Sequence, residues 1–159
     1  MPKSSEDIAV FRSKIMRLLI TNTGIVNLMG STLERAPIDL PYKYISPYQP
    51  VKDLILKTDK FINYNIRMAI DPRNNVYKDV TVYFWVCCHV DIIRTPTGLW
   101  YDEVVKEIDS MFGEQDILGV GDMTLSYLEP YAPVDGKFLG ELITFKTKSF
   151  TNGSKYTAY

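Results

Sequence analysis

The chain has 159 residues, 46% of them hydrophobic and 23% charged, and its formal net charge is −1. This composition is typical of a globular protein, and the length predicts a single domain, 1–159, that folds without stabilising metals or disulfides. The near-neutral charge argues against bulk electrostatic binding to nucleic acid or to an anionic membrane. The first residues are polar and acidic, and no apolar run approaches the ~20 residues that span a bilayer, so we expect no membrane contact.

The first 30 residues predict a helical part. Apolar residues recur at steps of three and four over 4–20, which is typical of an amphipathic helix. Gly24 interrupts this pattern, and one more short helical turn is expected before Gly30.

Residues 31–60 show no sustained periodicity and hold four of the nine prolines, interleaved with Tyr42, Tyr44 and Tyr48. Proline stiffens an extended backbone, and a loop of this length in a compact domain is usually functional or mobile. Two interpretations stay open. The segment is either a surface loop held by its aromatic side chains or an extended arm that lies on another subunit, and its low charge and spaced tyrosines favour the arm.

Residues 61–150 predict a core of strands and one helix. Alternating side chains predict strands over 61–70 and 78–90, joined as an antiparallel hairpin by the turn-forming residues between them. An apolar stripe that ends at Gly113 predicts a helix over 99–112. Two further strands are expected, near 123–127 and over 138–150, followed by a polar tail, 151–159.

This order predicts an α+β fold with a mostly antiparallel four-stranded sheet. Its β-β-α-β-β core would be packed by the N-terminal helix and the central helix, with the Pro/Tyr-rich arm extending from it. In the second strand, alternation directs Val80, Val82 and Phe84 to one face and Tyr83 and Trp85 to the other. We expect the second face to be covered by a neighbouring layer or subunit.

Candidate chemistry is sparse and centres on Cys87, His89 and Asp91, which alternation places on one strand face. A tetrahedral metal site needs ligands from a second element, and the chain holds no other histidine and only one other cysteine, Cys88. We therefore expect no metal and no cofactor, and, because adjacent side chains in a strand diverge, no disulfide. A small hydrolase that uses His89 with Asp91 or Asp102 is an alternative, but no sequence motif marks a nucleophile, and we predict no enzyme.

The run from Cys88 to Asp102, followed by Glu107-Ile108-Asp109, resembles small neck and tail-completion proteins of tailed bacteriophages. The resemblance continues through a later segment and covers about 60–150. The later segment is marked by Tyr131, Pro133, Phe138, Gly140, Leu142, Phe145 and Phe150.

The resemblance implies a tail terminator or related head-to-tail connector, located in the virion neck and assembled in the host cytoplasm. Such proteins form homo-oligomeric rings, commonly hexamers, that join the tail tube to head-side neck proteins, with DNA at most passing through the channel. They carry no catalytic residues. The arm at 31–60 departs from a minimal terminator and leaves a head-closure role open. Candidate contact residues are Tyr42, Tyr44, Tyr48, Trp85, Arg94, Trp100, Tyr156 and Tyr159.

Overall fold

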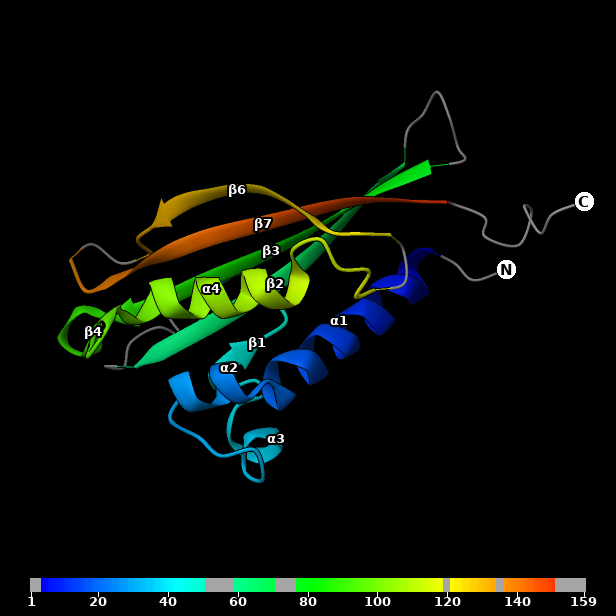
Figure 1. Cartoon of the computed structure of the whole chain (residues 1–159). Coiled ribbons are helices and arrows are strands. Elements are labelled where there is room, and N and C mark those ends of the chain that lie inside the picture. Colours follow the sequence, from blue (N-terminus) through cyan, green and yellow to red (C-terminus); the bar gives the residue numbers. More distant parts are fainter. Residues whose placement is uncertain (1–3, 51–58, 71–76, 119–120, 134–135, 151–159) are drawn as a thin grey trace, which may run out of the picture.

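The computed structural model describes residues 4–50, 59–70, 77–118, 121–133 and 136–150, and Figure 1 shows their arrangement. One sheet carries the main helices on a single face, which confirms the predicted α+β class. The strands lie in the order β1-β2-β3-β7-β6, with β1 parallel to β2 and the other pairs antiparallel. Their bounds are β1 (Ile45–Ser46), β2 (Lys60–Ile70), β3 (Tyr77–His89), β6 (Thr124–Tyr131) and β7 (Phe138–Phe150).

The sheet has five strands where the sequence predicts four, because part of the predicted arm folds onto it. Within 31–50, the backbone forms a short helix and then pairs Ile45 with Ile62 of β2. Leu40 and Ile45 are buried in the same apolar core as Ile15 and Ile25 of the first two helices. These residues are therefore part of the subunit rather than a free extended arm, and 51–58 lie outside the described residues. The helices are α1 (Ser4–Thr21), α2 (Thr23–Leu28), α3 (Ala36–Asp39) and α4 (Trp100–Phe112).

The predicted hairpin of β2 and β3 is present, with Ile62 opposite Val86 and Tyr64 opposite Phe84. Alternation works as expected, because the even-numbered residues of β3 from Val80 to Cys88 face the helices and are buried. The Phe84 ring packs 4.9 Å from the ring of Phe112 of α4, measured between centroids.

The strand β7 approaches β3 so closely at one point that only glycine fits. A Cβ atom on Gly140 would collide with the carbonyl oxygen of Val86. The two strands pair along their whole length, from Tyr77 opposite Phe150 to His89 opposite Phe138.

The helical layer begins with α1 and α2, which meet at Asn22. Its Oδ1 accepts a hydrogen bond from the Ile25 N–H (2.9 Å) and caps α2, so the chain turns at Asn22 and Gly24 lies inside the second helix. Gly24 leaves space for the carboxyl group of Glu107, where α2 packs on α4. Before α4 the chain forms η2 (Val90–Ile92) and a small hairpin of β4 (Arg94–Thr95) and β5 (Gly98–Leu99).

The helical layer does not extend over the whole sheet. α1 packs on β2, and α4 packs on β3 and β7, whereas β6 pairs with β7 at the far edge. In Figure 1, β6 lies along the upper side of the molecule and α1 along the lower right. Among the described residues, no helix is long and apolar enough to cross a membrane.

Candidate interaction surfaces

Most of the exposed large hydrophobic side chains fall into two groups, one on α1 and the segment around β1 and one on β6 and the start of β7. Their exposed fractions range from 37% to 70%. One group, near β1, belongs to α1 and to 33–48: Val10, Leu33, Ile38, Tyr42 and Tyr48. The other belongs to β6 and the adjoining start of β7: Leu125, Tyr127, Leu128 and Leu139. Only Ile92, among those that the structure describes, falls outside both groups.

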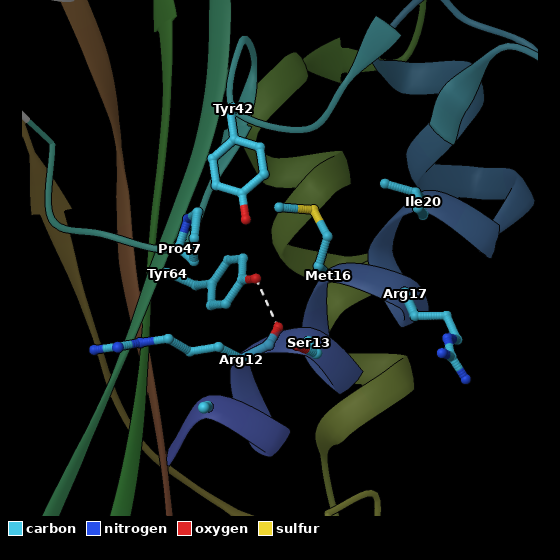
Figure 2. A pocket seen from close by; sticks show the side chains of 9 residues that line it. Arg12, Ser13, Met16, Arg17, Ile20, Tyr42, Pro47 and Tyr64 are labelled. Carbon is cyan, nitrogen blue, oxygen red and sulfur yellow. Dashed lines mark hydrogen bonds between the residues drawn. The ribbon is translucent and has the colours of Figure 1, made fainter. Parts of the chain in front are cut away.

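At the first edge, a groove of about 440 Å³ runs between α1 and the segment that leads into β1 (Figure 2). We call it the α1 groove. Tyr64 forms its floor, and its hydroxyl donates a hydrogen bond to the carbonyl oxygen of Arg12 (2.8 Å). Burial raises the pKa of Tyr64 above its ordinary value, so the hydroxyl is protonated and available as a donor.

Tyr42 stands over the α1 groove in an unusual backbone conformation. Its φ of 62° lies in the left-handed region, and its side chain is 69% exposed. Figure 2 shows its hydroxyl directed toward Tyr64 and Met16. The Tyr42 N–H donates to the carbonyl oxygen of Ile45 (2.8 Å), which holds this turn closed.

The outward face of α1 continues this surface. A shallow depression along the helix is lined by exposed residues: Ala9, Val10, Ser13, Lys14 and Arg17. Their spacing of three and four places them in one stripe. The stripe thus combines an apolar side chain, Val10 at 61% exposure, with two cations.

At the opposite edge, β6 presents two leucines beside α4. Leu125 pairs with Phe145, and Leu128 pairs with Ile143. Because those partners face the helices, both leucines lie on the helix side of the sheet, yet they remain 38% and 48% exposed. We call this surface the β6 shelf.

The end of α4 borders the β6 shelf with acidic side chains. A hollow of about 420 Å³ lies between α4 and β6 and is lined by Asp109, Gly113, Glu114, Thr124 and Leu125. The shelf therefore has an apolar floor and an acidic wall. Farther along β7, burial and the nearby Asp102 raise the pKa of Glu141.

The sheet face away from the helices carries a row of aromatic side chains that pack on one another. Tyr83 stacks on Trp85 with 5.8 Å between ring centroids, and Phe138 lies 5.1 Å from His89. Trp85 is only 9% exposed, and burial raises the pKa of Cys87 to about 12, so the thiol is protonated at neutral pH.

The candidate contact residues have very different surroundings. Tyr42, Tyr48 and Arg94 are exposed, whereas Tyr44 is half-buried with its ring 6.2 Å from that of Phe61. Trp100 is buried, and its indole N–H donates to the carbonyl oxygen of Leu28 (2.7 Å). Tyr156 and Tyr159 lie outside the described residues. The contact roles of all these residues remain predictions.

His89 occupies a structural position at the end of β3. Its Nδ1 accepts a hydrogen bond from the Asp91 N–H (3.2 Å) and caps η2, so Asp91 lies in this turn rather than on the strand face predicted from alternation. In the part of the chain that the structure describes, no three histidine, cysteine or acidic side chains converge as a metal site.

The sequence contains a signal for the two edge surfaces that a search for catalytic motifs misses. No acidic residue occurs over 8–33, whereas seven occur over 100–122, where Lys106 is the only cation. The net charge of −1 therefore conceals a stretch without acidic residues, which begins after Asp7 in α1, and an acidic stretch around α4.

No match to the chain is found among curated proteins. A family model described as YomW matches residues 13–147, which is most of the chain. The match runs from the middle of α1 into β7 and includes both edges of the sheet. The name of this family derives from a protein of SPbeta-type phages. The chain therefore belongs to the YomW family.

Proposed function

We propose that this protein is a structural component of a phage particle and acts by binding further copies of itself and neighbouring neck proteins. The observation that carries the proposal is the placement of exposed apolar side chains at two opposite edges of one sheet. Two different surfaces on opposite sides of a subunit suit a head-to-tail contact, which closes into a ring when the rotation between subunits allows it. The phage-derived family name supports the same conclusion.

Within the particle, we assign the protein to the neck. The proposed role is that of a tail terminator or tail-completion ring, expected to be a hexamer, that joins the tail tube to the head-side connector. Exposed apolar side chains at the contacts favour stable association, because burying them removes apolar surface from water. A head-closure protein or another neck connector is the alternative, and it would use the same kind of contact.

The test is to locate the protein in purified particles. Mass spectrometry should detect it in intact particles, and antibody-labelled particles should show the label at the junction of head and tail by electron microscopy. Phage that lack the gene should accumulate heads and tails that are not joined. Label that follows the head after head and tail are separated would favour the head-closure alternative. Absence of the protein from particles would contradict the proposal.

A further inference from the structure

We propose that the exposed stripe of α1 in one copy packs onto the β6 shelf of the next copy. This inference rests on the proposed homo-oligomer and specifies which two surfaces meet. The neighbouring helix would cover Leu125 and Leu128, which the subunit's own helices leave exposed. The occupant of the shelf is therefore a second copy of this chain.

The charges of the two surfaces are complementary. The α1 stripe carries Lys14 and Arg17, and the acidic side chains of α1, Glu6 and Asp7, lie near its start. The hollow beside the β6 shelf is walled by Asp109 and Glu114. Opposite charges facing each other across a contact favour the correct partner and orientation.

Both surfaces also expose apolar side chains. Val10 is 61% exposed on α1, and Leu125 and Leu128 are 38% and 48% exposed on β6. Each surface thus has an apolar centre with charged neighbours, which resembles the core and rim of a protein interface.

The positions of the two surfaces in the subunit allow them to meet. α1 lies near the β1 end of the strand order, and β6 forms the other end. Both surfaces lie on the helix side of the sheet, as the pairing of Leu125 with Phe145 shows for the shelf. A copy placed beside the β6 edge can therefore extend the helical layer with its own α1. Each copy would use one surface on each side, so the contact can repeat around a ring.

Charge reversal tests this contact. One variant carries Lys14→Glu and Arg17→Glu, and the other carries Asp109→Lys and Glu114→Lys. These side chains are on the surface, and lysine near the C-terminal end of α4 is compatible with the helix dipole, so both variants should fold. Circular dichroism and thermal unfolding check this, and Lys137→Glu, an exposed reversal outside both surfaces, is the control.

Sedimentation velocity of the full-length chains gives the readout. Each double variant alone should show a dissociation constant at least ~10-fold higher than the wild type, which corresponds to about 1.4 kcal/mol. An equimolar mixture of the two variants should regain wild-type assembly. In the mixture, the acidic α1 of the first variant meets the basic shelf of the second, and the unchanged basic α1 of the second meets the unchanged acidic shelf of the first. Alternating contacts of this kind close in a ring with an even number of subunits.

Three outcomes would overturn the inference. Assembly of either variant at wild-type affinity would show that these surfaces do not meet. Failure of the mixture to assemble would show that the charges do not face each other. A wild-type protein that stays monomeric would exclude a second copy as the occupant of the shelf. The first two outcomes leave the neck proposal intact, because that proposal depends on the location of the protein in particles.

Discussion

Tyr42 and Trp100 show how far the surroundings of two aromatic candidate contact residues can differ. Tyr42 is 69% exposed above the α1 groove, whereas Trp100 is 2% exposed. Trp100 lies at the start of α4 and reaches the last residue of α2 through its hydrogen bond to Leu28. The sequence identifies both as large aromatic side chains, but their exposure depends on which helix packs beside them.

The hydrogen bond of Trp100 leads to a prediction at this scale. Trp100→Phe keeps an aromatic ring but leaves the carbonyl of the half-buried Leu28 without its donor, so the free energy of unfolding should fall by about 0.5–1.5 kcal/mol. Trp100→Ala should cost about 3–5 kcal/mol because it also leaves a cavity. Urea unfolding at one fixed protein concentration measures both values. Tyr48→Phe, on a more exposed aromatic, is the matched control, and a Trp100→Phe effect no larger than this control would contradict the assignment.

At the scale of elements, the long strands and helices follow from local patterns. Residues 138–150 are predicted as a strand and form β7 with the same bounds, and 4–20 differs from α1 by one residue. These segments are long enough for their apolar periodicity to show. β1 has two residues and pairs in parallel with β2, so no periodicity can reveal it. The helix α3 includes Pro37 near its start. From the sequence alone, this proline-containing segment fits a loop as well as a helix.

The candidate surfaces could be predicted only in part for the same reason. The charge difference between α1 and the α4 region can be read directly from the sequence. The exposure of Leu125 and Leu128 cannot, because an alternating strand indicates only which residues share a face. These leucines are exposed because α4 packs on β3 and β7 and leaves the edge strand open.

The close approach of β3 and β7 gives a prediction for the sheet. Gly140→Ala would place a methyl group against the Val86 carbonyl, so the strands must shift, and the free energy of unfolding should fall by about 1–3 kcal/mol. Gly24→Ala is the control, since its neighbour is the movable end of Glu107 and alanine favours a helix. Thermal or urea unfolding compares the two variants. Equal stability of Gly140→Ala and Gly24→Ala would contradict the close approach.

At the scale of the whole molecule, the distribution of charge and apolar surface matters more than the totals. A net charge of −1 suggests a chain with no electrostatic preference, but the outward stripe of α1 carries Lys14 and Arg17, whereas the hollow between α4 and β6 is lined by Asp109 and Glu114. Exposed apolar side chains accompany both groups at opposite edges of the sheet. This polarity across the subunit suits the proposed association through unlike surfaces, which closes into a ring when the rotation between subunits allows it.

The mass of the purified full-length chain in solution tests this account most directly. We expect a closed homo-oligomer, near six times 18.3 kDa for a hexamer, when the mass is measured over a range of protein concentrations. Raising the salt concentration should shift the distribution toward smaller species, because screening weakens the attraction between exposed charges. A single species of 18.3 kDa at every concentration and at low salt would contradict the account.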